Sequence, residues 1–308
     1  MKAIIPAAGI GKRLQPHTLN RPKVMVPVAG KPILEHISSA LLEAGFNEIS
    51  VIVGYKKESI VDYFTAKYPG TFTFPVQEEM KGLAHAVLYG LDDVEEPVLI
   101  ILGDTIIDMD LSIFHDGREN MIAVVEVEDP KRFGIVETDE KGRITGMVEK
   151  PENPTSNQAI AGVYFLKNQQ KLKQAIETLI RDDIRTRNEY QLTDALALMM
   201  RSGEPFRAVP IKAWYDCGTP ETLLSTNRFL LTKHAANHGT CVDCILHEPV
   251  YIGKGTRIEH SEIGPDVAIG NDVKILHSCI KNSMVFAGAV LQDVDLHDSL
   301  IGEGTDLR

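Results

Sequence analysis

The chemistry of this sequence is concentrated in a group of cations near its N-terminus. No acid precedes Glu35, although the whole chain has a formal net charge of −11. The basic residues before that point are Lys2, Lys12, Arg13, Arg21, Lys23 and Lys31. An acidic chain that gathers cations in one segment is suited to a small, multiply charged anion. We expect a nucleoside triphosphate as that anion, and neither a nucleic acid nor a membrane as a partner.

A glycine-containing loop lies among these cations. Residues 2–6 are predicted to form a short buried strand, and the residues after it are Ala7, Ala8, Gly9, Ile10, Gly11, Lys12 and Arg13. Small residues just beyond a strand let backbone N–H groups approach phosphate oxygens. The loop is not a Walker loop, because no Gly-Lys-Ser/Thr follows, and it lacks the third glycine of the dinucleotide fingerprint. Two glycines alone would also suit an ordinary turn.

The elements that must position this loop alternate between apolar strands and amphipathic helices. Helices are predicted over 32–44, 57–67 and 83–91, and strands over 49–53, 72–77 and 98–102. This rhythm indicates a mostly parallel sheet with helices on both faces, which binds ligands at the carboxyl ends of its strands. Polar features at or beyond those ends are the Gly9 loop, Gln77, Asp104 and Asp216.

The middle of the chain is richer in strands. Strands are predicted over 122–127, 134–137, 144–149 and 159–165, and helices over 167–181, 191–202 and 219–234. The last of these helices has Thr219 as its N-cap and Pro220 at its first position.

The N-terminal sequence closely resembles the signature motif of a known family. The matching residues are Gly9-Ile10-Gly11-Lys12-Arg13-Leu14, Pro16, Thr18, Pro22-Lys23, Pro27-Val28 and Lys31-Pro32. They resemble the sugar nucleotidyltransferases, or nucleoside-diphosphate-sugar pyrophosphorylases. The resemblance implies an α/β fold with a mostly parallel, Rossmann-like nucleotidyltransferase sheet. It departs at Lys12, where the family usually has Thr or Ser, which leaves open how the triphosphate is held.

The resemblance also implies roles for the nucleotide side of the site. Arg13 would hold the β- and γ-phosphates, and Lys23 would bridge the nucleotide and sugar phosphates. The residues implied to bind the nucleotide are Ala7, Ala8, Gly9, Gly11, Lys12, Arg13, Gln77, Gly82 and Leu83. Because a glutamine amide suits the adjacent N–H and carbonyl of a pyrimidine, we expect thymine or uracil as the base.

The metal and the sugar phosphate are assigned in the same way. Asp104 would be the principal Mg²⁺ ligand and Asp216 its partner, so Arg13, Lys23, Asp104 and Asp216 form the implied catalytic set. The residues implied to bind the sugar phosphate are Gly134, Glu149, Lys150, Gly162 and Tyr164. Asp104 and Asp216 could separately be a strand end and a turn cap, but all these residues occur in the family's order and contexts.

The implied reaction joins a nucleoside triphosphate to a sugar 1-phosphate and releases pyrophosphate. The segments 188–195 and 216–221 and the C-terminal tail most resemble the longer glucose-1-phosphate thymidylyltransferases, which favours dTTP and glucose 1-phosphate. The sequences of the segments 82–86 and 103–105 also resemble those of uridylyltransferases that use glucose 1-phosphate or N-acetylglucosamine 1-phosphate. An alternative that is not an active enzyme is a catalytically silent regulatory subunit of a pyrophosphorylase complex.

The chain changes character after residue 245. Aliphatic residues recur every five or six positions, as at Ile258, Ile263, Ile269, Ile275 and Ile280. This resembles the hexapeptide repeat of a left-handed parallel β-helix, with room for about three coils. We divide the chain into a catalytic domain over 1–237 and a β-helix over 238–308. The β-helix could be catalytic, as in sugar acyltransferases, but a scaffold is favoured because those enzymes usually have more coils.

The tail is expected to contribute to assembly more than to the chemistry. The implied catalytic residues all precede residue 220, and open β-helix ends favour packing on the catalytic domain and on a second subunit, so we expect a homo-oligomer.

Cysteine usage and hydropathy bear on the compartment. His238, Cys241, Cys244 and His247 recur at intervals of three, which could bind zinc but also arises in a β-helix. With no apolar run long enough for a membrane and no signal peptide, the protein is expected to be cytoplasmic, with free thiols.

Overall fold

The computed structural model describes all 308 residues, which form two compact units. The first unit contains residues Met1–Gly9 and Ile37–Trp214, and the second contains Ile10–His36 and Tyr215–Arg308. The second unit therefore includes the segment 10–36, which carries most of the N-terminal motif and is called here the signature segment. The domain boundary predicted between residues 237 and 238 stays a prediction.

The first unit is built on a nine-stranded sheet. Its path runs β10-β9-β11-β6-β1-β4-β5, with β8 beside β11 and β12 beside β8. The strands are β1 (Lys2–Pro6), β4 (Ile49–Ile52), β5 (Phe72–Thr73), β6 (Val98–Ile101), β8 (Asn120–Glu126), β9 (Gly134–Thr138), β10 (Ile144–Glu149), β11 (Gln158–Leu166) and β12 (Phe206–Pro210). Strand β7 (Thr105–Ile107) lies outside this path, and β13 (Trp214–Asp216) continues into the second unit.

The pairing in this sheet changes direction along the chain. Strands β6, β1, β4 and β5 are parallel, whereas β11 runs antiparallel to β6 and β8. All residues of β4 and β6 are buried, as expected for parallel strands covered on both faces. The predicted fold class is confirmed, and the antiparallel part corresponds to the strand-rich middle of the sequence.

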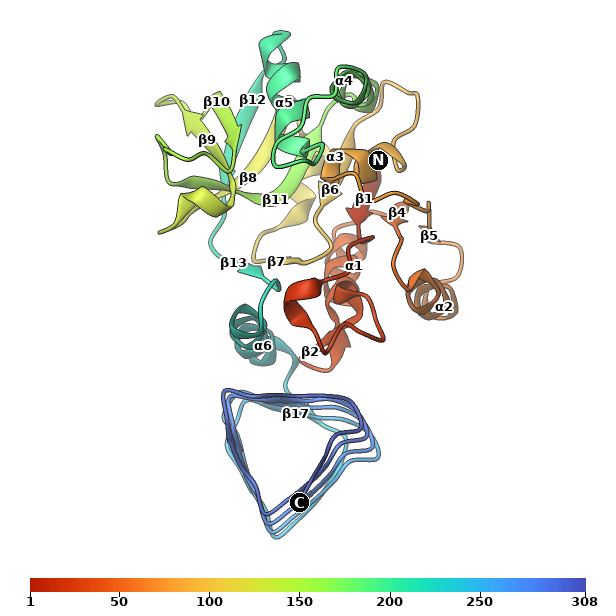
Figure 1. Cartoon of the computed structure of the whole chain (residues 1–308), viewed down its shortest axis with the longest axis vertical. Coiled ribbons are helices and arrows are strands. Elements are labelled where there is room, and N and C mark those ends of the chain that lie inside the picture. The colour runs from red at the N-terminus through yellow and green to blue at the C-terminus, as the bar shows by residue number, and fades with distance from the viewer. The chain divides into compact units, whose positions relative to one another are not determined.

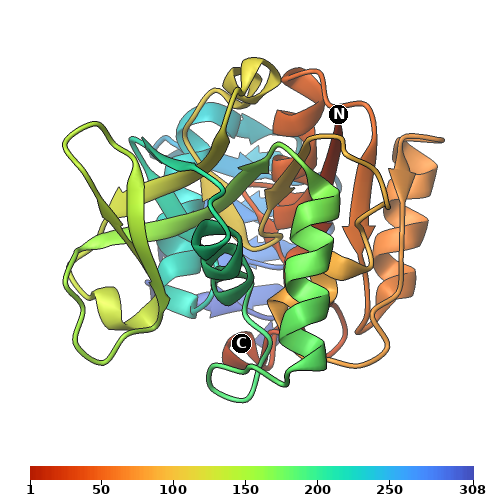
Figure 2. The ribbon, with the colours of Figure 1, turned by 90° about the horizontal axis from the view of Figure 1, so that it is seen from above.

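The helices follow the predicted amphipathic segments. They are α1 (Ile33–Glu43), α2 (Lys57–Lys67), α3 (Leu83–Leu88), α4 (Gln169–Arg181) and α5 (Leu192–Arg201), with short 3-10 turns η3 (Leu111–Asp116) and η4 (Pro130–Arg132). Helices α4 and α5 lie side by side (Figure 2). Their apolar faces share one core with the sheet, in which Leu172, Ile176 and Leu196 are fully buried.

Two predicted elements are shorter in the structure. Only Phe72–Thr73 of the segment 72–77 forms a strand, because Pro75 has no N–H to donate to the ladder. Helix α3 ends at Leu88 and not at residue 91. None of the helices has the length and apolar character that crossing a bilayer requires.

The second unit ends in a β-helix whose strands wind as stacked triangular coils (Figure 1). Its three faces contain five, five and four parallel strands. The strands are β14 (Ala236–Asn237), β15 (Thr240–Val242), β16 (Ile245–Leu246), β17 (Val250–Ile252), β18 (Arg257–Glu259), β19 (Glu262–Ile263), β20 (Val267–Ile269), β21 (Lys274–Leu276), β22 (Cys279–Lys281), β23 (Met284–Val285), β24 (Val290–Gln292), β25 (Asp295–His297), β26 (Leu300–Ile301) and β27 (Asp306–Leu307).

The interior of this β-helix is the predicted aliphatic ladder. Ile258, Ile263, Ile269 and Ile280 are fully buried, which confirms the assignment. The estimate of about three coils was too low, because the coils begin at Ala236, before the aliphatic repeat becomes regular. The preference for a scaffold over an acyltransferase stays a prediction.

The rest of the second unit packs on one face of the β-helix. It consists of η1 (Lys12–Leu14), η2 (Lys23–Met25), the hairpin of β2 (Pro27–Val28) and β3 (Lys31–Pro32), and helix α6 (Pro220–His234). Buried Asn227 of α6 joins these parts: its side chain accepts from the Ala29 N–H at 3.0 Å and donates to the Asp266 carbonyl at 3.2 Å. The signature segment is thus anchored to α6, and α6 to the β-helix.

Candidate active site

In the second unit, Gly11 sets the path of the loop that carries Lys12 and Arg13. Gly11 has φ +71°, and a Cβ there would lie 2.7 Å from the Cβ of Lys23. Its carbonyl accepts a hydrogen bond from the Thr18 hydroxyl at 2.9 Å. Only glycine combines this conformation with so close an approach. Lys12 and Arg13 are exposed on η1, which begins just after Gly11.

The structure brings Arg13, Lys23 and Asp216 together. The Nζ of Lys23 lies 4.0 Å from the Oδ1 of Asp216, although the Lys23 side chain is only 10% exposed. A Cβ on Gly218 would lie within 3.0 Å of both the Asp216 carboxylate and the Arg13 guanidinium. No acid lies near these cations along the chain before Glu35, but the fold places Asp216 beside them.

Helix α6 fixes the backbone that carries Asp216. Cys217, the next residue, is fully buried, and its thiol lies 3.6 Å from the Thr226 hydroxyl on α6. Thr219 caps the helix through a reciprocal capping box with Thr222, and Pro220 occupies the first turn as predicted. Asp216 therefore stands on a short strand that ends against a well-capped helix.

In the first unit, Ala7 and Ala8 directly follow β1, a central strand of the sheet. Both are buried; the Ala7 N–H donates to the Ile52 carbonyl at 2.8 Å, and the Ala8 carbonyl accepts from the Tyr55 N–H at 3.3 Å. Gly9, by contrast, is exposed, and a Cβ there would meet no atom within 4 Å. The backbone at Gly9 is open to a ligand.

Gln77 is held in place by His85, a residue that had no predicted role. Its side chain is buried, and its Nε2 lies 3.0 Å from Nδ1 of His85. Partial burial and then the nearby Lys81 lower the pKa of His85. A neutral ring can accept a hydrogen bond from Gln77 at Nδ1. His85 thereby orients the amide expected to read the base.

Gly82 joins this region to the chain near residue 190. It has φ +117°, and a Cβ would lie 2.6 Å from the carbonyl oxygen of Tyr190. The Tyr190 N–H donates to the Lys81 carbonyl, and the Tyr190 carbonyl accepts from the Ala84 N–H, both at 2.9 Å. Gly82 caps α3 at this point, and Leu83 begins the helix and packs on the core.

Glu149 and Lys150 lie where β10 ends. One carboxylate oxygen of Glu149 accepts from the Thr193 hydroxyl at 2.7 Å, and the other lies 3.1 Å from the Lys150 Nζ. Gly134 pairs with Glu149 across the strands, and a Cβ there would press on the Thr193 hydroxyl at 2.8 Å. Lys150 has φ +44°, a conformation that costs energy for a residue with a side chain and redirects the chain as β10 ends.

Tyr164 lies near both Glu149 and Asp104. Burial raises the pKa of Tyr164, and the negative charges of Glu149 and Asp104 raise it further, so all three face one region. Gly162 lies in an irregular part of β11 with φ +81°, and its carbonyl accepts from the Leu102 N–H at 2.9 Å. This contact fixes the turn that presents Asp104.

Two further residues, on α5, interact with Glu149 and were missed in the sequence. Thr193 orients Glu149, and Asp194, the next residue, has a buried Oδ2 without a hydrogen-bond partner. Burial raises the pKa of Asp194, a hydrogen bond with Thr186 opposes this, and the negative charge of Glu149 adds to it. Both lie in the segment 188–195, which carries part of the family resemblance, but neither residue had an assigned role.

The predicted site residues fall into two groups. Arg13, Lys23 and Asp216 gather in the second unit, and the base-reading and sugar-facing residues lie in the first. Asp104 and Asp216 belong to different units, so the site that they would share stays a prediction. Carboxylate oxygens are hard ligands that suit Mg²⁺, which is usually held by one or two carboxylates and substrate phosphates.

No group of three or more His, Cys, Asp or Glu residues in the structure has the arrangement of a metal site. The Cys244 thiol donates to the carbonyls of Val242 and Ile258 at 3.2 and 3.3 Å, and Cys241 and Cys244 pack against the β-helix core. All four cysteines are free thiols.

Comparison with known proteins places this geometry in a family. The sequence model of the nucleotidyl transferase family matches residues 2–233. The bifunctional protein GlmU of Methanocaldococcus jannaschii is 42% identical over 234 residues, which is 76% of this chain and 55% of that protein. This chain thus spans about half the length of that relative.

Two other proteins match over nearly their whole length. The UTP–glucose-1-phosphate uridylyltransferase AglF of Haloferax volcanii is 36% identical over 72% of this chain and 93% of its own. A solved structure from Bacillus anthracis, described as a glucose-1-phosphate thymidylyltransferase, superposes with a TM-score of 0.66 at 27% identity, covering 78% of this chain and 98% of its own. The resemblance seen in the sequence is confirmed: the chain belongs to the nucleotidyl transferase family, among the sugar nucleotidyltransferases.

Proposed function

We propose that the protein transfers a nucleotidyl group from a pyrimidine nucleoside triphosphate to a sugar 1-phosphate, most specifically from dTTP to glucose 1-phosphate. The observation that supports this most is that Arg13, on the turn that follows Gly11, lies together with Lys23 and Asp216 in a chain of this family. Two cations with a single carboxylate are suited to hold phosphates.

The reaction needs little covalent help from the protein. A phosphate oxygen of the sugar 1-phosphate attacks the α-phosphorus in line, a new P–O bond forms, and the bond to the β-phosphate breaks. The bonding electrons leave with pyrophosphate, and no proton has to be removed because the attacking oxygen is already ionised. The protein must align two anions that repel each other and neutralise their charge.

The side chains divide this work by charge and by geometry. Arg13 stabilises the leaving pyrophosphate, and Lys23 contacts both phosphate groups. Lys150 binds the sugar phosphate, while Glu149, oriented by Thr193, accepts hydrogen bonds from sugar hydroxyls. Mg²⁺ on Asp104 and Asp216, when bound, would neutralise further phosphate charge.

UTP is the second candidate nucleotide, and a specific observation favours it. AglF, whose name gives UTP as its substrate, matches over 93% of its length. Because dTTP and UTP differ at one methyl group and one hydroxyl, Gln77 would read either base in the same way. A pyrophosphate-release assay with dTTP, UTP, ATP and GTP, each with glucose 1-phosphate and N-acetylglucosamine 1-phosphate, separates these possibilities. Preference for a purine would contradict the role of Gln77, and no turnover with any pair would favour the regulatory subunit.

Asp104→Asn tests the proposed metal. The substitution keeps the shape of the side chain but removes its charge, so we expect turnover to fall by about three orders of magnitude or more at limiting Mg²⁺. Circular dichroism and thermal unfolding serve as controls for the fold. Turnover like that of the wild type at limiting Mg²⁺ would contradict the assignment.

The cytoplasmic compartment and the homo-oligomer are also proposals. Light scattering on the full-length protein tests the oligomer, and a monomer would contradict it.

A further inference from the structure

The β-helix contacts the signature segment at residues on both sides of the predicted phosphate ligands. Arg21 forms an ion pair with Glu303, which lies in the last coil. Its guanidinium carbon also lies 6.0 Å from the centre of the Phe286 ring. Phe286 follows β23 and is 3% exposed, so this contact is buried on the side of the β-helix. Arg21 is separated from Lys23 only by Pro22. Because the proline ring fixes φ, the backbone of Lys23 can move little relative to Arg21.

His17 makes a second contact with the same ring. The centres of the His17 and Phe286 rings are 5.3 Å apart, and the planes are nearly perpendicular at 86°, a favourable edge-to-face arrangement. Burial, and then the charge of Arg21, lower the pKa of His17, so its ring is neutral near neutral pH. His17 and Thr18 lie between Arg13 and Lys23, and Thr18 bonds to the Gly11 carbonyl. Phe286 thus supports the turn that connects the two cations.

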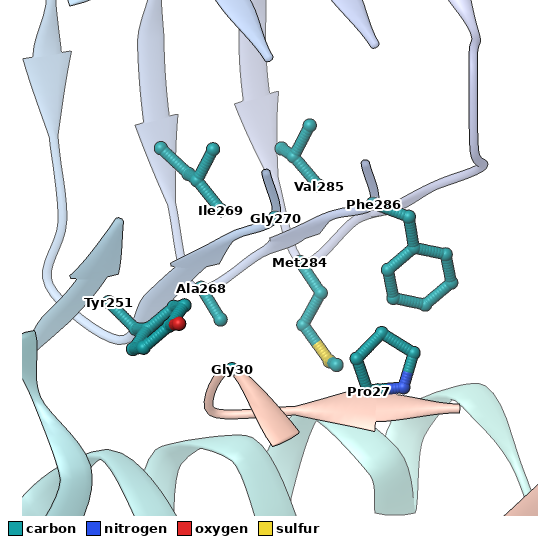
Figure 3. Close-up of a pocket in the computed structure, with 9 residues that line it drawn as sticks. All are labelled: Pro27, Gly30, Tyr251, Ala268, Ile269, Gly270, Met284, Val285 and Phe286. Carbon is teal, nitrogen blue, oxygen red and sulfur yellow. The ribbon is translucent and has the colours of Figure 1, made fainter. Parts of the chain in front are cut away.

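The hairpin after Lys23 is the third contact. Figure 3 shows Pro27 and Gly30 facing Tyr251, Met284 and Phe286 on the outer face of the β-helix. Gly30 has φ +83°, and a Cβ there would lie 2.2 Å from the Tyr251 ring. The hairpin lies so close to the coil that no side chain fits at this position.

We infer that the β-helix positions the phosphate ligands of the active site, with Phe286 and Glu303 as positioning residues that act through His17 and Arg21. The signature segment contains only two 3-10 turns and a two-stranded hairpin before α1. Such short elements do not fix a backbone by their own hydrogen bonds, so support from a neighbour decides the orientation of Arg13 and Lys23. This inference rests on the proposed function, and it revises the expectation that the tail serves assembly more than chemistry.

The test uses the full-length protein with the variants Glu303→Arg and Phe286→Ala. Glu303→Arg places two cations against each other on an exposed part of the last coil, and Phe286→Ala removes the ring between His17 and Arg21. The matched control is Glu259→Arg, which breaks another carboxylate–arginine pair, with Arg257, on a different face of the same β-helix.

The first measurement is hydrogen exchange of the backbone amides of residues 10–36, which needs no activity. We expect exchange to become about threefold faster or more in both variants and unchanged in the control. The second is kcat/KM for the triphosphate, which we expect to fall about fivefold for Glu303→Arg and about tenfold for Phe286→Ala. KM for the sugar 1-phosphate should change less, because Glu149 and Lys150 belong to the other unit.

The outcomes separate this inference from the proposed function. Unchanged exchange in both variants, or faster exchange with unchanged kcat/KM, would overturn the inference even in an active enzyme. If the wild type turns over no triphosphate, the proposed function fails. Calorimetric affinity for inorganic pyrophosphate then replaces kcat/KM, and equal affinity in all variants would overturn the inference as well.

Discussion

The two groups of site residues are built in opposite ways. In the first unit, Glu149 stands on a sheet strand, is 10% exposed and is held by Thr193 and Lys150 at 2.7 and 3.1 Å. In the second unit, Arg13 is exposed on a 3-10 turn. The Lys23 side chain, although also only 10% exposed, stands on another 3-10 turn, and its Nζ lies 4.0 Å from Asp216. Sugar hydroxyls are distinguished by geometry, which needs a fixed frame. Phosphate charge can be neutralised by side chains on loops that another element supports.

Among substitutions in the second unit, Arg13→Ala should have the largest effect on turnover. Removing a cation from the leaving pyrophosphate should lower kcat/KM by about two to three orders of magnitude, as the loss of a key electrostatic stabiliser does. Lys12→Ala is the matched control, because Lys12 is the adjacent exposed cation at the position where the family has a hydroxyl residue. We expect it to cost less than about threefold if the backbone N–H makes the contact.

These values are measured by pyrophosphate release at saturating sugar 1-phosphate. A change of less than severalfold for Arg13→Ala would mean that Arg13 is only a surface charge. Equal large losses for both variants would assign the phosphate contact to the pair and not to Arg13.

His36 should make the second unit sensitive to acid. Burial lowers its pKa to about 4, against an ordinary value of 6.5; the Val28 carbonyl and Glu35 oppose this, and His234 and Lys31 add to it. The unfolded chain therefore binds a proton at pH values where the folded chain does not. The contribution of His36 to the free energy of unfolding is fully present above about pH 6.5. About 3 kcal/mol of it is lost as the pH decreases toward 4.

Urea unfolding of the wild type and His36→Gln between pH 4 and 7 measures this effect. The variant should lose much of the decline while retaining a donor for the Val28 carbonyl, which lies 2.9 Å from Nε2 of His36. An identical decline in both proteins would assign the acid sensitivity to other groups. His17 and His85, whose pKa values are also lowered, are the candidates.

The local pattern of the sequence predicted the elements well and the contacts poorly. Helix α2 occupies the predicted segment 57–67, and α6 has the predicted cap, because periodicity and capping residues are local signals. The approach of Asp216 to Lys23 joins residues nearly two hundred positions apart. No spacing rule could show it, and the family resemblance supplied only their roles.

Residues that act through others were the least visible. His85 lies in the segment 82–86 and Thr193 in the segment 188–195, both of which carry part of the family resemblance. Their importance comes from the atoms that they orient, Nε2 of Gln77 and Oε2 of Glu149. The number of coils was underestimated because the residues that pack inside the first coil are Cys241, Cys244 and Leu246. They do not belong to the regular isoleucine repeat.

Glu149→Gln tests the role of the first unit in binding the sugar. The amide keeps the size of the side chain and removes the charge that strengthens hydrogen bonds to sugar hydroxyls. We expect kcat/KM for the sugar 1-phosphate to fall about tenfold or more, since such bonds contribute about 1.5–3 kcal/mol. KM for the triphosphate should stay within about twofold. If KM for the triphosphate rose as much as KM for the sugar, the two groups of residues would not have separate tasks.

Thr193→Val should produce the smallest effect and tests orientation alone. Valine has nearly the size of threonine, but it cannot donate to Glu149, so the carboxylate keeps only Lys150 as a partner. We expect KM for the sugar 1-phosphate to rise about fivefold and stability to fall by about 1 kcal/mol, the usual contribution of one hydrogen bond. Thr145→Val on the same strand as Glu149 is the control, because Thr145 donates at 3.3 Å to the backbone carbonyl of Glu137 and not to Glu149. If both variants left KM unchanged, the fixed frame of the first unit would not depend on Thr193, and the rigidity of β10 itself would have to hold Glu149.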